Sequence, residues 1–114
     1  MCIRDSTLAA FADPVRLRLL NLLSGEHEEI CVCHLHGALE LPQPTISRHL
    51  AYLRKHGMVV GRKEGLWVHY RRAIPKTSLH RSLLGSLATC LGDLPVFRED
   101  QLRLARAMTC CDET

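Results

Sequence analysis

Thiol and imidazole groups are crowded into one short stretch of this chain. Cys31 and Cys33 are separated by a single residue, and His34 and His36 follow at once. Thiolates are soft ligands that select soft metal ions, whereas imidazole suits zinc and related metals. The spacing is too cramped for an ordinary structural zinc site, which argues against a zinc-stabilised interaction module. The stretch is therefore a candidate for metal-binding or redox chemistry.

The cysteine content favours free thiols over a disulfide framework. Six cysteines among 114 residues is about 5%, below the roughly 8–10% typical of disulfide scaffolds. We expect no transmembrane span, and Arg4, Asp5 and Ser6 interrupt any candidate signal peptide. These observations predict a protein of the reducing cytoplasm. Its thiols could bind metal, undergo oxidation or pack as small buried side chains.

The remaining cysteines divide by their surroundings. Cys110 and Cys111 are adjacent in a polar tail, where they could chelate a metalloid or have no role. Cys90 lies on an apolar helix face, so we expect it in the core or in a dimer interface. Cys2 belongs to residues 1–10, which are a candidate for a disordered or non-native segment.

Length and charge limit the classes of function. A chain of 114 residues predicts one domain covering residues 1–114. The net charge is only +3, but residues 42–72 hold seven basic side chains and one acidic side chain. A basic block in an otherwise near-neutral chain suggests a surface for a polyanion, although a merely solvated basic face is the alternative.

Hydrophobic periodicity predicts three helices in the first half of the chain. Asp13 and Pro14 form a helix start, and Gly25 is the expected end. A second helix is predicted from about Ile30 to Glu40. A third helix begins near Gln43, with Ile46, Leu50 and Leu53 facing inward, and ends at Gly57.

A hairpin and two more helices are predicted in the second half. The hairpin pairs residues 58–63 with residues 66–71 around a turn at Glu64 and Gly65, with Leu66, Val68 and Tyr70 on one face. The fourth helix is capped by Thr77 or Ser78, and the last runs from about residue 98 to residue 108. The apolar stripes of these helices are Leu79, Leu83, Leu87 and Leu91, widened by Leu84, Ala88 and Cys90, and then Leu102, Ala105 and Met108.

This order of elements predicts an α+β fold, mostly helical: a winged helix-turn-helix of about five helices plus a two-stranded hairpin wing. Residues 42–72 would form the reading helix and the wing, and residues 77–111 the terminal helices, the dimer interface and the cysteine tail. The side chains expected to face DNA are Gln43, Thr45, Ser47, Arg48, His49 and Tyr52, with Arg62 and Lys63 at the wing tip. Arg48 could contact guanine with two hydrogen bonds. The alternative is a small helical domain whose polar helix face is only hydrated.

Three segments resemble a known family. Residues 43–50 (QPTISRHL) and 53–59 (LRKHGMV) resemble the recognition helix of the ArsR/SmtB metal-sensing repressors. Residues 65–71 (GLWVHYR) look like the wing of its arsenic-responsive branch. The match runs from about Phe11 to Arg72 and continues more loosely to Cys111. The resemblance implies a homodimer that pairs through its terminal helices, binds double-stranded operator DNA, and leaves it on binding a metal or metalloid.

Residues 29–36 (EICVCHLH) resemble the metal-binding box of that family. The resemblance implies that Cys31 and Cys33 bind trivalent arsenic or antimony. This chain departs from the box because His36 stands where a third cysteine is frequent and His34 where an acid is usual. The third ligand is therefore open between Cys110, Cys111, an exogenous thiol and none. Coordination by His36 would instead favour zinc or cadmium.

A mechanism follows from the expected helix at residues 30–40. Residues i and i+2 of an ideal helix do not face each other, so two sulfurs on one metalloid would require its first turn to distort. That distortion would favour a form unable to bind DNA, if the ligand prefers that form.

Two other functions remain open. One is a redox-sensing repressor in which Cys31 and Cys33 are oxidised. The other is a small dithiol enzyme resembling an arsenate reductase. No phosphate-cradling glycine loop or Ser/His/Asp arrangement surrounds these cysteines, which argues against the enzyme. We therefore expect no catalytic residues, no small-molecule substrate and no membrane partner.

Overall fold

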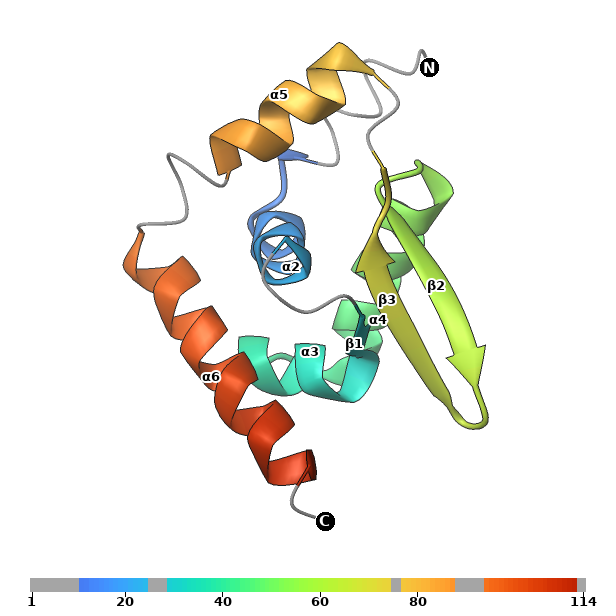
Figure 1. The fold of residues 1–114 in the computed structure, drawn as a ribbon, viewed down its shortest axis with the longest axis vertical. Helices are drawn as coiled ribbons and strands as arrows, with labels where there is room; N and C mark the ends of the chain where they lie inside the picture. The colour runs from blue at the N-terminus through green and yellow to red at the C-terminus, as the bar shows by residue number, and fades with distance from the viewer. Residues whose placement is uncertain (1–10, 25–28, 75–76, 88–93, 113–114) are drawn as a thin grey trace.

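The computed structural model describes residues 11–24, 29–74, 77–87 and 94–112, with side chains described through residue 108. Its elements are α2 (Pro14–Leu23), β1 (Ile30–Cys31), α3 (Val32–Leu39), α4 (Gln43–Lys55), β2 (Val59–Glu64), β3 (Trp67–Arg72), α5 (Ser78–Ser86) and α6 (Pro95–Asp112). Helix α2 lies in the middle of the fold, with α5 above it, α3 below it, α6 on one side and the β2–β3 hairpin on the other (Figure 1). The described part of the chain is thus the mostly helical winged helix-turn-helix that the sequence predicts.

The sheet has one strand more than the predicted two-stranded wing. Its antiparallel order is β1-β3-β2, and β1 pairs Ile30 with Tyr70 and Cys31 with His69. The prediction of a helix beginning at Ile30 is therefore wrong by two residues. Ile30 and Cys31 are extended because their backbone can pair with β3, while the Ile30 side chain is fully buried. A strand of two residues is too short to produce a period in the sequence.

The hairpin turn lies one residue later than predicted, at Gly65 and Leu66. Gly65 has a φ of +62°, which glycine adopts without a steric penalty at the first central position of a tight hairpin turn. This shift places Leu66 at the tip, 93% exposed, so its predicted place on the buried face is wrong. Tyr70 is buried as expected and packs over Gly61, where a Cβ would meet its ring at 3.1 Å.

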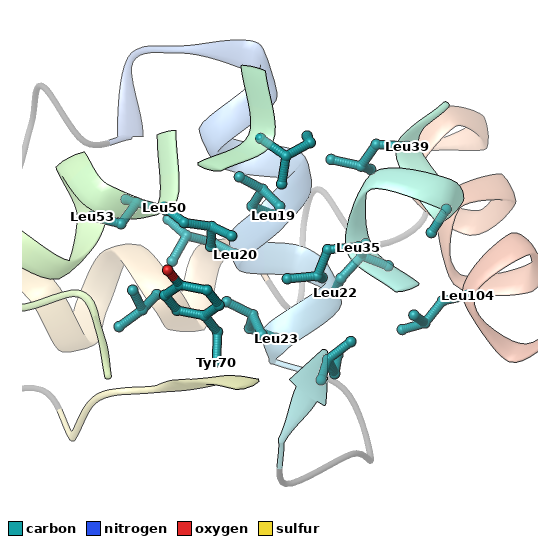
Figure 2. Packing of buried hydrophobic residues seen from close by; sticks show 14 of the residues in the cluster. Leu19, Leu20, Leu22, Leu23, Leu35, Leu39, Leu50, Leu53, Tyr70 and Leu104 are labelled. Carbon is teal, nitrogen blue, oxygen red and sulfur yellow. The ribbon is translucent and has the colours of Figure 1, made fainter. Parts of the chain in front are cut away.

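Aliphatic side chains from α2, α3, α4 and α6 form the core (Figure 2). The predicted inward stripe of α4 is confirmed, since Ile46, Leu50 and Leu53 are fully buried. The start of α2 is also confirmed: Asp13 caps it by accepting a hydrogen bond from the Val15 backbone N–H at 2.8 Å. The predicted end at Gly25 lies outside the described residues.

A tight stop at the end of α4 sets the direction of the wing. Gly57 has a φ of +76°, and its N–H donates to the Arg54 carbonyl at 3.1 Å. The N–H of Met58 donates to the Leu53 carbonyl at 2.8 Å, and both of these side chains are buried. This pair of hydrogen bonds, with its apolar contact, is a Schellman motif. The predicted helix end at Gly57 is confirmed, and β2 begins two residues later.

The terminal helices are present, but they face the core with a different phase. In α5 the Thr77 side chain caps the helix by accepting from the His80 N–H at 3.1 Å, as predicted. The buried positions are His80, Leu84 and Leu87, whereas Leu79 and Leu83 are only half-buried. Residues 88–91 of the predicted stripe lie outside the described residues.

Helix α6 is longer than predicted and is rotated. Its buried side chains are Phe97, Asp100 and Leu104, while Leu102, expected inside, is 59% exposed. The sequence pattern failed here because a buried carboxylate occupies an inward position that apolar periodicity does not recognise. Cys110 and Cys111, expected in a tail, fall within the helical span, but their side chains lie outside the described part.

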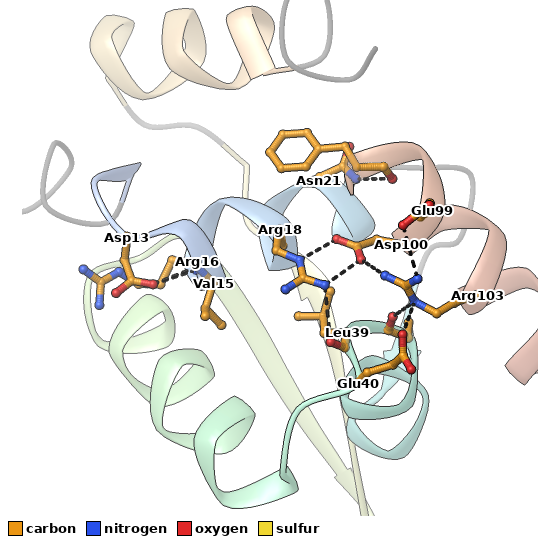
Figure 3. A network of polar contacts seen from close by, with 12 residues as sticks. Asp13, Val15, Arg16, Arg18, Asn21, Leu39, Glu40, Glu99, Asp100 and Arg103 are labelled. Atoms are coloured by element: carbon orange, nitrogen blue, oxygen red, sulfur yellow. Dashed lines mark hydrogen bonds and ion pairs between the residues drawn. The ribbon is translucent and has the colours of Figure 1, made fainter. Parts of the chain in front are cut away.

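The buried carboxylate ties α6 to the helix-turn-helix (Figure 3). Asp100 has no exposed surface and accepts two hydrogen bonds from Arg18, both at 2.8 Å, and one from Arg103 at 2.7 Å. The two guanidinium groups also donate to the last carbonyls of α3, Leu39 at 3.3 Å and Ala38 at 2.6 Å. These contacts cap the end of α3, where the turn into α4 begins.

Candidate functional site

The two thiols of the Cys-x-Cys pair face each other at the junction of β1 and α3. The Sγ atom of Cys33 donates a hydrogen bond to the Sγ atom of Cys31, and the two sulfurs are 3.1 Å apart. Cys31 is the last residue of β1 and the N-cap of α3, with an extended backbone (φ −69°, ψ 144°). We call this pair the dithiol. Cys31 is 7% exposed and Cys33 is half-buried, so one sulfur is more accessible than the other.

The expected distortion of a helical turn is therefore unnecessary. The sulfurs converge in this structure because only Cys33 is helical, while Cys31 belongs to the strand. The extended residue turns its side chain toward the first turn of α3, and the i, i+2 rule for helices does not apply across this boundary. The prediction that both sulfurs start apart on one helix is wrong, since the strand brings them together.

A third protein ligand is not assembled within the described residues. No group of three or more His, Cys, Asp or Glu side chains in that part of the chain could hold a metal ion. His36 is half-buried in the last turn of α3, where its carbonyl accepts from the Leu41 N–H at 3.2 Å. The side chains of Cys110 and Cys111 lie outside the described part. The identity of a third ligand therefore stays a prediction.

The residue before β1 is bound to the wing. Arg62 of β2 donates to Glu29 through Nη2 at 2.7 Å and through Nε at 3.0 Å, and through Nη1 to Glu64 at 3.0 Å. The hydrogen bonds from Arg62 lower the pKa of the Glu29 carboxyl, and those carboxylates raise the pKa of Arg62. Glu29 has no role in the sequence prediction, and no local pattern could have found this contact because it depends on the register of the sheet.

The reading helix carries the predicted polar side chains on and beside its outer face. Gln43 and Arg48 are exposed, while Thr45, Ser47 and His49 are half-buried. The Gln43 side chain donates to the Ser47 hydroxyl at 3.3 Å. Within the described residues, Arg48 forms no ion pair, so its guanidinium is available to a partner.

Tyr52 and Arg62 have protein contacts that the sequence did not predict. The Arg16 guanidinium lies 4.2 Å from the centre of the Tyr52 ring, and the His56 ring lies 4.5 Å from it. Tyr52 thus packs α4 against α2. Arg62 is held by two carboxylates, whereas Lys63 is exposed and has no ion pair among the described residues. The two wing residues thus differ in their ion pairs within the described residues, and the DNA contact of each stays a prediction.

Comparison with known proteins places this geometry in a family. Residues 13–60 match the family described as "Bacterial regulatory protein, arsR family". The structure of HlyU from Vibrio cholerae N16961 is 32% identical, with a TM-score of 0.62 over 77% of this chain and 92% of HlyU. The chain belongs to the ArsR/SmtB family of transcriptional regulators. The arsenical resistance operon repressor of Escherichia coli and the transcriptional regulator HlyU of Vibrio vulnificus CMCP6 are relatives named as regulators.

Several curated relatives are named for arsenic, among them the two that follow. The ArsR/SmtB member described here is 57% identical over 60 residues to the arsenical resistance operon repressor of Escherichia coli, covering 53% of this chain and 50% of the relative. It is 53% identical over 60 residues to the arsenic resistance transcriptional regulator ArsR1 of Pseudomonas putida, covering 53% of this chain and 46% of the relative. The chain thus spans about half the length of these two proteins. In the described part, no helix is both long and apolar enough to cross a membrane.

Proposed function

We propose that this ArsR/SmtB protein is a repressor that binds double-stranded operator DNA and releases it when the dithiol binds trivalent arsenic or antimony. The observation that carries the proposal is the 3.1 Å contact between the Cys31 and Cys33 sulfurs, directly at the start of the helix pair that reads DNA. The arsenic-named relatives support the choice of ligand.

The sulfur separation fits a narrow bond angle. With metal–sulfur bonds of about 2.3 Å, a tetrahedral ion needs sulfurs about 3.8 Å apart, whereas 3.1 Å corresponds to an angle of about 85°. A trivalent arsenic or antimony centre carries a lone pair that compresses its bond angles, so it suits this spacing better than tetrahedral zinc does. The N-terminus of α3 adds a favourable field for the negative charge of bound thiolates.

The position of the dithiol supplies a path to the DNA-reading surface. Cys31 is paired with His69 of β3, and Cys33 lies in the first turn of α3, which packs against α4. A ligand bonded to both sulfurs replaces the hydrogen bond between them and fixes the angle between β1 and α3. It weakens DNA binding only to the extent that it binds the displaced form more tightly.

The proposed DNA contacts follow from exposure and from free charge. Arg48 reads a base, Gln43, Thr45, Ser47 and His49 contact bases or phosphates, and Lys63 meets the backbone beside the wing. Tyr52 stays in the proposed interface as a side chain at its edge, held by Arg16.

We also propose that the protein acts as a homodimer. Leu94 and Val96 at the start of α6 and Leu102 in its middle are large apolar side chains that are exposed in the single chain. Leu79 and Leu83 of α5 are half-buried. A second copy would cover such surface.

Light scattering tests the homodimer. It should give twice the mass of one chain, and Leu102→Asp should shift the measured mass toward that of one chain.

A titration of the protein–operator complex tests the function. Arsenite and antimonite should release labelled operator in an anisotropy assay, and Cys31→Ser/Cys33→Ser should bind operator but not release it. Cys110→Ser/Cys111→Ser is the matched control, because it removes two adjacent thiols elsewhere. Release by the Cys31/Cys33 variant equal to that of the wild type would show that the sensing site lies elsewhere.

Two alternatives to arsenic or antimony would use the same dithiol: oxidation of the two sulfurs, and binding of cadmium or zinc. The sulfurs are already in contact, which favours oxidation as a second signal, and one matched structure is described as reduced HlyU. Release by peroxide without arsenite would support that version. Release by cadmium or zinc at lower concentration than arsenite would indicate a site completed by histidine, with His36 as the first candidate.

A further inference from the structure

One row of side chains crosses the sheet from the dithiol to the wing. Cys31 of β1 lies opposite His69 of β3, and His69 lies opposite Arg62 of β2. Directly opposed residues of antiparallel strands point to the same face. Cys31, His69 and Arg62 therefore share one face of the sheet, opposite to the face on which Ile30 and Tyr70 enter the core.

Glu29, the residue before β1, binds the Arg62 end of this row. It precedes Cys31 by two residues, and its carboxylate binds both Nη2 and Nε of Arg62 at 2.7 and 3.0 Å. A two-point contact between a planar guanidinium and a carboxylate fixes orientation as well as distance. The segment that carries the dithiol is thus joined to the outer wing strand β2 by a side-chain bridge in addition to the β1–β3 pairing.

We propose that the Glu29–Arg62 bridge transmits the state of the dithiol to the wing, so that Arg62 is a positioning residue and not a phosphate contact. This inference rests on the proposed function. The metal-free arrangement, in which the sulfurs touch and the bridge is formed, is the form that binds the operator. When a ligand moves Cys31, Glu29 moves with it along the same backbone, and the wing follows through Arg62.

The surroundings of the bridge make this role testable. The side chains of Arg62 and Glu29 are 51% and 29% exposed, and exposed ion pairs contribute little to folding stability. Removing the bridge should therefore leave the protein folded. Arg62 has a second carboxylate partner, Glu64, which lies on the same strand and also approaches His69 Nε2 at 3.7 Å. Glu64 belongs to β2, so unlike Glu29 it does not share a backbone segment with Cys31.

This second partner supplies a matched control. We would measure operator affinity with and without arsenite for the wild type, Glu29→Gln and Glu64→Gln, and call the ratio of the two dissociation constants the coupling factor. Such factors are typically about 5–150-fold. We expect Glu29→Gln to lower the factor by at least about threefold, while Glu64→Gln leaves it close to the wild-type value. Arsenite affinity in the absence of DNA should be the same in all three proteins.

Further arms separate transmission from other effects. Arg62→Lys keeps the charge but loses the two-point contact, so it should lower the coupling factor as Glu29→Gln does. The double variant Glu29→Gln/Arg62→Lys should have the same coupling factor as either single variant, because both substitutions remove the same contact. Trp67, the chain's one tryptophan, lies on the wing. Its fluorescence would be compared between the variants and the wild type to check that they are folded.

The outcomes distinguish the two proposals. If the wild type itself is not released by arsenite, the proposed function fails and this inference with it. If the wild type is released and Glu29→Gln has the same coupling factor, or Glu64→Gln loses as much as Glu29→Gln, the bridge does not transmit the signal. In that case the path through α3 to α4 carries it alone.

Discussion

At the residue scale, two side chains of the same type differ in the groups that they contact. Arg48 and Arg62 both lie in the basic block of residues 42–72, and the sequence assigns both to DNA. The structure shows Arg48 exposed on α4 and Arg62 held between Glu29 and Glu64. The two arginines therefore differ in their protein partners, and the DNA contact of each stays a prediction.

The free guanidinium of Arg48 leads to a prediction about DNA. Arg48→Ala should weaken binding to the operator by about 1–3 kcal/mol at its preferred base pair, with little effect on random DNA, because the lost contact reads a base. Competition assays with operator and random duplexes measure this difference.

Lys63→Ala is the control for Arg48→Ala, since Lys63 is an exposed charge on the wing. It should weaken both duplexes alike and reduce the slope of log affinity against log salt by about one unit. Equal losses on operator and random DNA for Arg48→Ala would instead identify Arg48 as a phosphate contact.

At the element scale, contacts from distant helices hold the reading pair together. The end of α3 is capped by Arg18 from α2 and Arg103 from α6, and both are oriented by Asp100. The hydrogen bond from Arg18 to Asp100 raises the pKa of Arg18. Glu40, just after α3, has a φ of +56°, so the turn into α4 combines a strained residue with a cap supplied from outside. Helix α6 therefore stabilises the turn of the helix-turn-helix.

Loss of the buried carboxylate should destabilise the whole fold. Asp100→Asn would remove the negative charge and one of the two acceptor oxygens that Arg18 and Arg103 share, and breaking such a buried ion pair costs about 3 kcal/mol. Urea unfolding should show this as a lower free energy of unfolding.

Glu99→Gln provides the comparison for Asp100→Asn. Glu99 pairs with the same Arg103 at 3.6 Å, but its side chain is 66% exposed. Its removal should change the free energy of unfolding by less than about 0.5 kcal/mol. Similar losses in the two variants would mean that Asp100 does not hold the cap.

At the scale of the whole molecule, stability should depend on pH through a buried histidine. His80 of α5 is 3% exposed, and its Nε2 has no hydrogen-bond partner among the described residues. The Phe11 ring packs against it with its centre at 6.5 Å. Burial, with a smaller contribution from the charge of Arg72, lowers the pKa of His80 below its ordinary value of 6.5. The folded protein therefore favours the neutral imidazole.

The sign of the effect follows from proton linkage. Below pH 6.5 the unfolded chain binds a proton at His80 that the folded protein does not bind until a lower pH. The free energy of unfolding should fall as pH drops from 6.5 toward the folded pKa, by at most about 1.4 kcal/mol per pH unit. Urea titrations between pH 5 and pH 8 should show this fall in the wild type and a shallower one in His80→Phe. Parallel curves for the two proteins would assign the pH dependence to other groups.

Features that depend on near neighbours in the chain can be predicted from the amino-acid sequence. The Asp13 cap, the inward stripe of α4, the Schellman stop at Gly57 and the hairpin each depend on residues within a few positions of one another. The spacing of Cys31 and Cys33 likewise predicts a thiol site from the sequence alone, and the function of that site stays a prediction. Propensity, capping and period are short-range effects, and they leave a readable pattern in the chain.

Contacts between distant parts of the chain could not be predicted in this way. The pairing of Ile30 and Cys31 with β3 turned a predicted helical turn into a strand and brought the two sulfurs to 3.1 Å. Asp100 is buried, so α6 turns a different face to the core from the one that its apolar residues predict. The register of the sheet places Glu29 beside Arg62. Each of these contacts joins residues at least about 30 positions apart in the chain, or depends on a pairing that does. The free energy of strand pairing, ion pairing and burial across such separations has no local signature, so it is settled when the chain packs.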